Sequence, residues 1–370
     1  MLSDLKVIEL ASVLAGPSVG QFFAELGAEV IKVENLKTGG DVTRTWKGRD
    51  EQTDDRSAYF CSVNWGKKSV AIDLSTAAGL KAVQKLAAKS DMVIASYKPG
   101  DAEKLGVSYQ QLTAINPQLI YGQITGYGSD NDRVGYDAVI QAESGFMDLN
   151  GLPEGPPTKM PVALVDVLAA HHLKEGLLLA LLKREKTGNG SCVEVSLIQA
   201  AISSLANQAS NWLVAHKLPK RQGSAHPNIA PYGESFLTRD DKRILLAIGS
   251  DRQFLDLLVI LALNISEDVR FVTNQSRVIH RKELNELLTA SISSFEADYL
   301  MQEIHRKKIP AGIIQSIDKV FEMEEARRIL LEANGFRGVR NFVGTHQPLS
   351  LLPPPHFGEH TDEVLKSLGF

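Results

Sequence analysis

One carboxylate stands out in this sequence because its neighbours are almost all apolar. Asp166 lies in the segment 161–170, which reads PVALVDVLAA. Burying an ionised carboxylate is costly unless it is paired or hydrogen-bonded. Asp166 could therefore cap a helix N-terminus through backbone N–H groups, or act as a nucleophile or general base at the mouth of a pocket. The two roles are compatible, since a helix N-terminus also stabilises an oxyanion formed at that carboxyl.

Basic residues recur near the ends of predicted strands. In an open α/β sheet, ligands bind beyond the carboxyl ends of the strands, and cations gathered there can hold a phosphorylated cofactor. Each lysine taken alone is more typical of a solvated surface. The candidate cations are Lys37, Lys67, Lys68, Lys98, Lys104 and Arg133.

The turn at 14–20, LAGPSVG, places two glycines beside a predicted helix N-terminus, which makes a usable anion site. It is not the dinucleotide fingerprint, because Leu14 occupies the first glycine position. Glu34 superficially fits a ribose-binding carboxylate, which leaves a nicotinamide-dependent dehydrogenase as a weak alternative. His171 and His172 are adjacent on a helix and face different ways, so they make a poor metal pair, and we expect no metal.

The elements that must position these residues alternate along the first half of the chain. Strands are predicted at 7–10, 30–33, 69–74, 92–96, 119–124 and 192–195, with helical patterns between them. Long helices are predicted at 166–186 and 196–215, and Ser75 is predicted to cap a helix that runs to Lys89. This alternation predicts an α/β fold with a parallel, doubly wound sheet.

The character of the sequence changes after residue 215. Residues 216–232 are polar and contain three prolines, which indicates a linker. Residues 233–330 contain a predicted hairpin, 234–237 with 243–248, and helices near 253–263, 282–294 and 299–307. We therefore expect a large domain over 1–215 and a smaller α+β domain over 233–330.

Composition describes a soluble globular protein without saying which one. The 370 residues are 44% hydrophobic and 23% charged, with a formal net charge of −4, which disfavours nucleic-acid and membrane-surface binding. The N-terminus lacks the pattern of a signal peptide, and the apolar runs are too short to span a membrane. The two cysteines, Cys61 and Cys192, fit a reduced setting. We expect a cytoplasmic enzyme.

Several motifs taken together resemble the class III coenzyme A transferases, the family of formyl-CoA and carnitine-CoA transferases that also includes the α-methylacyl-CoA racemases. The resemblance covers essentially the whole chain, and its motifs are specific only in combination. They are Asp166 at its apolar helix start, LAGP at 14–17, NWGKKSV at 64–70, YKPG at 97–100, KLG at 104–106, GYG at 126–128 and GEHTDEVL at 358–365.

The resemblance implies an architecture that periodicity alone does not show. In the family, a Rossmann-like large domain binds CoA and is completed by the C-terminal segment, here 331–370, while the smaller domain is inserted between. Each chain forms a ring, and two rings interlock as a homodimer.

The resemblance also implies a mechanism. Asp166 matches the family's nucleophilic aspartate, which would take CoA from an acyl-CoA donor as an aspartyl-CoA thioester and pass it to a carboxylic acid. Splitting one difficult exchange into activated steps is covalent catalysis. CoA enters as a co-substrate, and the scheme uses neither ATP nor metal.

The CoA contacts follow from the same resemblance, position by position. Residues of the first turn would line the cofactor, two cations would lie on its phosphate side, and a loop and helix would surround the adenosine and pyrophosphate. These positions are Val13, Leu14, Ala15, Lys37, Lys68 (or Lys67 in its place), Tyr97, Lys98, Asp101, Lys104 and Arg133. On the substrate side, Arg44, His226 and Asn228 could hold the second carboxylate of a small dicarboxylate.

Three departures from the family pattern bear on the reaction. The racemases carry His where this chain has Tyr136, in Gly135-Tyr136-Asp137, and a tyrosine is a poor base at neutral pH. The glycine run of the formyl-CoA enzymes is reduced here to the segment 249–253, GSDRQ, which argues against formyl-CoA and oxalate. Leu14 replaces a glutamine of those enzymes.

The sequence therefore favours an acyl-CoA:carboxylate CoA-transferase. An acyl-CoA racemase or epimerase is an alternative, against which Tyr136 argues. A non-catalytic CoA-binding protein is a second alternative from a different class. The expected partners are acyl-CoA, a small carboxylic acid and a second copy of the chain.

Overall fold

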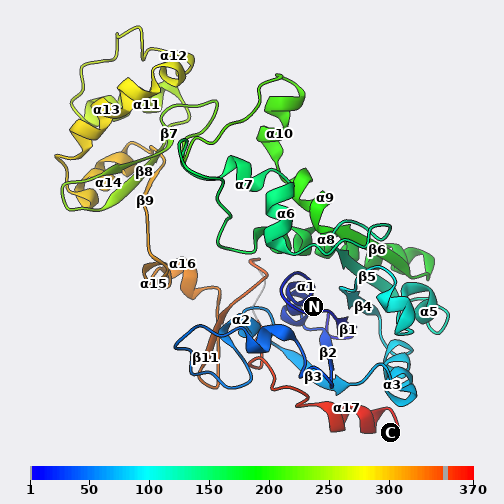
Figure 1. Cartoon of the computed structure of the whole chain (residues 1–370). Helices are drawn as coiled ribbons and strands as arrows, with labels where there is room; N and C mark the ends of the chain where they lie inside the picture. The colour runs from blue at the N-terminus through cyan, green and yellow to red at the C-terminus, as the bar shows by residue number, and fades with distance from the viewer. Residues whose placement is uncertain (1, 345–348) are drawn as a thin grey trace. The chain divides into compact units, whose positions relative to one another are not determined.

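The computed structural model describes residues 2–344 and 349–370. The chain divides into two compact units. The first comprises Met1–Phe146, Lys159–Ala206 and Glu325–Phe370, and the second comprises Met147–Thr158 and Asn207–Glu324 (Figure 1). The sequence placed the first boundary near 215 and the last near 330, and it did not assign 147–158 to the second unit.

A six-stranded parallel sheet forms the centre of the first unit, in the order β3-β2-β1-β4-β5-β6. The predicted strands and the parallel α/β class are thus confirmed. The strands are β1 (Lys6–Leu10), β2 (Glu29–Asn35), β3 (Lys67–Ile72), β4 (Met92–Ala95), β5 (Ile120–Thr125) and β6 (Ser191–Ser196).

Helices cover both faces of this sheet because successive side chains of each strand point to opposite sides. Val7 and Val30 pack with α1 (Ala15–Glu25), α8 (Leu164–Thr187) and α9 (Leu197–Ser203). Ile8 and Ile31 pack with α3 (Ala77–Ala87), α5 (Tyr109–Thr113) and α17 (Thr361–Ser367). The remaining helices of this unit are η1 (Val42–Thr45), α2 (Ala58–Cys61), α4 (Asp101–Lys104) and α6 (Asp137–Glu143).

Two predicted helix details are wrong. The helix expected over 196–215 is two helices, α9 and α10 (Ala206–Leu213), because the chain turns at Ala206 with φ 47° and the hydroxyls of Ser203 and Ser204 donate to the carbonyl of Ala200. The cap of α3 is Thr76, whose Oγ1 accepts the N–H of Gly79, while Ser75 bonds to Asp73.

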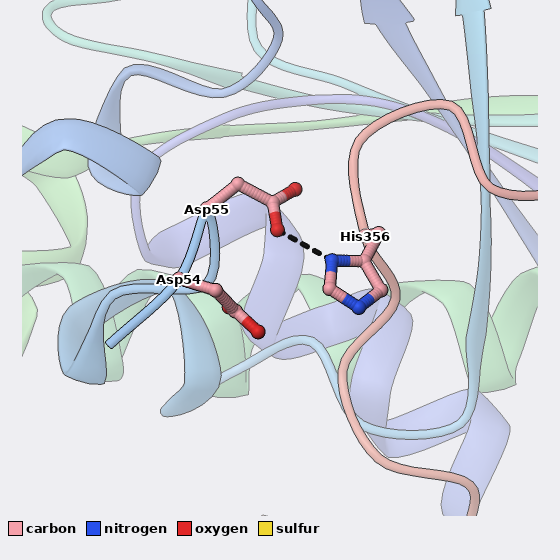
Figure 2. A group of neighbouring side chains, drawn as sticks. All are labelled: Asp54, Asp55 and His356. Carbon is pink, nitrogen blue, oxygen red and sulfur yellow. Dashed lines mark hydrogen bonds and ion pairs between the residues drawn. The ribbon is translucent and has the colours of Figure 1, made fainter. Parts of the chain in front are cut away.

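The C-terminal segment belongs to the first unit. It contributes the hairpin of β10 (Leu330–Ala333) and β11 (Phe336–Val339), and α17, which lies beside β3 (Figure 1). Figure 2 shows one tie: His356 Nδ1 lies 2.5 Å from Asp55 Oδ1, next to Asp54. These three side chains are close enough to share an ion, but Asp54 pairs with Arg56 and Asp55 accepts the N–H of Phe357. The cluster therefore fastens the segment to the loop before α2.

A layer of buried charges joins the first three strands. The Glu9 carboxylate on β1 lies 2.9 Å from Lys32 Nζ on β2 and 2.7 Å from Lys67 Nζ on β3, and all three side chains are buried. Helix α1 crosses over Glu9 at Gly20, where a Cβ would lie 1.8 Å from a Glu9 oxygen. Burial lowers the pKa of Lys67 to about 8, partly offset by Glu9. Removing one partner of this layer would leave an uncompensated buried charge in the sheet.

The second unit has its own core. A three-stranded antiparallel sheet, β7 (Tyr232–Leu237), β8 (Arg243–Ala247) and β9 (Ala311–Ile313), confirms the predicted hairpin. It packs with α11 (Asp251–Ile260), α13 (Arg281–Ile292) and α14 (Ala297–Arg306). The other helices are α12 (Asn274–Ile279) and α15 (Ile317–Val320). The chain passes between the units within α7 (Phe146–Leu149), between Thr158 and Lys159, and within α10 and α16 (Glu324–Arg327).

Across the described ranges, 2–344 and 349–370, the structure contains no helix that combines the length and the apolar character needed to cross a bilayer.

Replacing Lys67 with Met should lower the free energy of unfolding by about 3–5 kcal/mol, because it removes a buried cation from the Glu9 carboxylate. Lys68→Met is the matched control. Lys68 pairs with Glu29 and Glu363 at the surface, and its loss should cost at most about 1 kcal/mol. Urea unfolding measures both, and equal losses would contradict the buried-layer account.

Candidate active site

The order of the strands creates a crevice at one edge of the sheet. From β1 the chain continues to β2 on one side, whereas β4 lies on the other side of β1. Loops that leave two such strands diverge, and ligands bind in the crevice between them. The segments that follow β1 and β4 meet here, where the N–H of Ser12 donates to Ser96 Oγ at 3.4 Å.

A pocket opens at this crevice, and it brings together eight residues that the sequence had singled out. Gly16, Thr125, Gly126 and Leu197 also contribute to its wall. The eight are Val13, Leu14, Ala15, Tyr97, Lys98, Arg133, Tyr136 and Asp166.

A second pocket adjoins the first, and the two share Ser12, Ser96 and Tyr97 in their walls. Lys37 lines this second pocket, where its Nζ lies 3.1 Å from Asp73 and 2.7 Å from Ser75 Oγ. Because they share these wall residues, the two pockets lie side by side at the carboxyl ends of the strands.

The structure places three predicted cations elsewhere. Lys67 is enclosed by Glu9, Asn64 and the carbonyl of Pro17, and it lines neither pocket, so its contacts in this structure are with the protein interior. Lys68 is paired with two surface carboxylates, away from both pockets. Arg44 is buried against Glu34 at 2.6 Å, with its guanidinium 3.8 Å from the Phe60 ring centre, and it lines neither pocket.

Two further predicted positions lie on α4. Lys104 and Asp101 are exposed or half-buried, pair with each other at 3.2 Å, and line neither pocket.

His226 and Asn228 belong to the second unit. There His226 Nδ1 accepts the N–H of Asn228 at 3.1 Å, which leaves Nε2 as the protonated nitrogen of a neutral ring. Arg281 holds the loop by donating to the carbonyls of His226 and Ile229. Both predicted residues thus lie on one fastened loop.

Asp166 occupies the third position of α8, with 7% of its surface exposed. Burial, and then the nearby charge of Asp137, raise the pKa of Asp166 to about 7. Within residues 2–344 and 349–370, no hydrogen-bond donor contacts its carboxylate. Asp166 is therefore a poorly solvated carboxyl that titrates near neutrality, which is typical of a functional group.

The cap of α8 comes from Asp137, whose role sequence reasoning missed. Asp137 Oδ1 accepts the N–H of Val165 at 2.7 Å, and its Oδ2 accepts from Gln141 Nε2 at 2.7 Å. The sequence does contain a hint of this role. The residue at the N-cap of α8 is Ala163, which has no side-chain acceptor, so the cap has to come from a residue elsewhere in the chain. Asp137 thus performs the capping role considered for Asp166 and leaves the Asp166 carboxylate available.

The start of α1 supplies another part of the pocket wall. Its first residues, Ala15 and Gly16, line the pocket, and their backbone N–H groups precede the first helical hydrogen bond, from the N–H of Ser18 to the carbonyl of Leu14. Gly16 fits because a Cβ there would lie 2.4 Å from Ala11 Cβ. The pocket therefore joins a buried carboxyl to the positive end of a helix.

Comparison with known proteins decides the family. The model of CoA-transferase family III matches residues 2–361. This chain belongs to CoA-transferase family III. As the family name states, it is an enzyme that transfers CoA, which confirms the sequence-based resemblance and the expected enzyme class.

Named relatives of this CoA-transferase span nearly its full length. It is 37% identical to the succinate–glutarate CoA-transferase of Agrobacterium fabrum, over 99% of this chain and 95% of that protein. It is 33% identical to the human succinyl-CoA:glutarate CoA-transferase, over 99% and 86%. Among solved structures, a CAIB/BAIF family protein from Brucella suis is 38% identical, with a TM-score of 0.86 over 98% of both chains.

Asp166→Asn should change how stability depends on pH. The pKa of Asp166 is raised to about 7 in the folded protein, from 3.8 in the unfolded chain. Ionisation of Asp166 therefore does not lower the free energy of unfolding below pH 3.8, and lowers it increasingly as the pH rises to about 7. The Asn variant should therefore gain about 2–3 kcal/mol of unfolding free energy relative to the native protein between pH 5 and pH 8, at about 1.4 kcal/mol per pKa unit.

Urea unfolding across this pH range measures the difference, with Asp4→Asn at the exposed N-terminal end as the control. A difference between Asp166→Asn and the native protein that stays constant with pH would show that Asp166 is not perturbed.

Proposed function

We propose that this enzyme moves CoA between small dicarboxylic acids, with a succinyl-CoA-like donor and an acceptor of the size of glutarate. The observation that carries the proposal is Asp166, a carboxyl held poorly solvated in a pocket at the sheet crevice. The names of the relatives support the substrate class, since they act on succinate and glutarate.

The proposed reaction proceeds through covalent intermediates on Asp166. A carboxylate oxygen attacks the donor thioester carbonyl and the C–S bond breaks, which gives an aspartyl–acyl anhydride and CoA thiolate. The thiolate attacks the aspartyl carbonyl, which releases the donor acid and leaves aspartyl-CoA. The acceptor carboxylate then displaces the thiolate, and the thiolate attacks the acceptor's carbonyl to give the new thioester and free Asp166.

The environment of Asp166 suits each of these steps. A carboxylate that few donors solvate loses little hydration when it attacks. The N–H groups at the start of α1 and the dipole of α8 favour the negative charge of a tetrahedral intermediate. Every step exchanges one acyl oxygen or sulfur bond for another, so the scheme balances without a proton donor, ATP or a metal.

CoA is proposed to lie along the two adjoining pockets. The turn of Val13, Leu14 and Ala15 would face the thioester end, while Tyr97 would pack on the pantetheine or adenosine portion. Cations at both pockets would meet the phosphates by short-range charge neutralisation. These cations are Lys37, Lys98 and Arg133. Lys104 and its partner Asp101, on the neighbouring α4, would contact the outer end of the cofactor.

His226 and Asn228, on their loop of the second unit, remain candidates for binding a substrate carboxylate. In a neutral His226 ring, the Nε2–H group would donate a hydrogen bond to such a carboxylate. Tyr136, which lines the Asp166 pocket, has no imidazole to exchange an α-proton, and this supports transfer over racemisation.

A homodimer of interlocked rings in the cytoplasm is also part of the proposal. The outer face of α8 supports an association surface, since Leu179 and Leu182 are 67% and 60% exposed there, beside Leu178. Exposed leucines repeated on one helix face favour burial against another chain.

Asp166→Asn should lower CoA exchange between succinyl-CoA and glutarate by at least about 10³-fold, since the amide cannot form the anhydride. Mass spectrometry of the CoA esters measures exchange, and Asp4→Asn is the control that should retain it. Transfer retained by Asp166→Asn would contradict the nucleophile assignment.

A second experiment separates transfer from racemisation. Incubation of the enzyme with an acyl-CoA in deuterated water, without an acceptor acid, should give no deuterium at the α-carbon of the acyl group. The appearance of α-deuterated acyl-CoA would favour a racemase.

A further inference from the structure

The turn between β1 and α1 contains one residue in an unfavourable conformation. Val13 has φ 73°, in the left-handed region, which a β-branched side chain rarely adopts. Such conformations persist only where the surroundings hold them, and they gather at functional sites. Val13 lines the pocket that contains Asp166.

The holding group is Asp41, which comes from the loop after β2. The N–H of Val13 points between the two carboxylate oxygens of Asp41, at 3.3 Å from each. Asp41 is buried, and its Oδ1 also accepts from the N–H and hydroxyl of Thr43. The Asp41 carboxylate is therefore fixed in place, independently of Val13.

Lys32 fixes the other end of the same turn. Its Nζ lies 2.9 Å from Asp41 Oδ2 and donates to the carbonyl of Ala11 at 2.8 Å. One buried ion pair thus holds the carbonyl of residue 11 and the N–H of residue 13, on either side of Ser12. Glu9 completes the anchorage, at 2.9 Å from the same ammonium.

We propose that Asp41 is a positioning residue for CoA transfer, which acts by holding Val13 in its left-handed conformation. This inference rests on the proposed function of the pocket. If Val13 relaxed to a negative φ, the chain would enter α1 in a different direction, and Leu14, Ala15 and Gly16 would leave their places in the wall of the Asp166 pocket. Asp41 lines the second pocket and not the one that contains Asp166, and its carboxylate bonds to Val13, Thr43 and Lys32, so it touches no reacting atom.

A mutant cycle separates this role from a general effect on folding. Glycine adopts the left-handed region without strain, so it should not need the Asp41 contact. Asp41→Asn should lower CoA exchange at least about 10-fold when Val13 is present, but less than about 3-fold in the Val13→Gly background. Val13→Gly alone is the reference for the second comparison. Equal losses in the two backgrounds would overturn the proposal.

Two additions keep the test decisive. Asp41→Glu retains a charge for Lys32 and shifts the carboxylate by one methylene, so it provides the same cycle if Asp41→Asn does not fold. Circular dichroism and thermal unfolding check each variant.

Affinity for CoA itself, measured by calorimetry, gives a readout that needs no turnover. If the native enzyme exchanges no CoA between the dicarboxylates, the proposed function fails. The positioning role is then tested by CoA affinity alone. A loss of affinity in Asp41→Asn that is smaller in the Val13→Gly background supports it, and equal losses in the two backgrounds overturn it.

Discussion

The Glu9 carboxylate, held between two buried lysines of neighbouring strands, is the interaction on which the rest of the first unit depends. It neutralises Lys32 and Lys67 inside a sheet that offers them no water. Through Lys32 the same layer reaches Asp41 and the turn that opens α1. The charges that hold the sheet together therefore also shape one wall of the pocket.

At the start of α8, two carboxylates share the available contacts unequally. Asp137 takes the capping contact at the start of α8 and leaves Asp166 with burial and a like charge nearby. Where the Glu9 layer pairs every charge, the pocket keeps one carboxyl unpaired among the described residues, and its pKa rises. The pKa of Asp166 is raised because burial and the charge of Asp137 act on a carboxyl that no donor among the described residues contacts.

Local pattern predicted the strands, the helix α8 and the placement of the Asp166 carboxylate at the start of that helix, because each depends on neighbouring residues. It could not predict the strand order, which joins the ends of β1 and β4 across more than eighty residues. Lys67 and Lys68 look alike in sequence, and only the pleat of β3 sends one inward to Glu9 and the other to the surface. Asp137 was missed because its partner, Val165, lies 28 residues away.

The proposed mechanism requires an aspartyl-CoA thioester at Asp166, and direct trapping of this intermediate is the sharpest test. The enzyme would be incubated with succinyl-CoA alone, quenched with hydroxylamine, digested and analysed by mass spectrometry. The account predicts a hydroxamate on the peptide that contains Asp166, formed more readily above pH 7 than at pH 5.5. A modified residue other than Asp166, or the absence of any adduct in an enzyme that exchanges CoA, would contradict it.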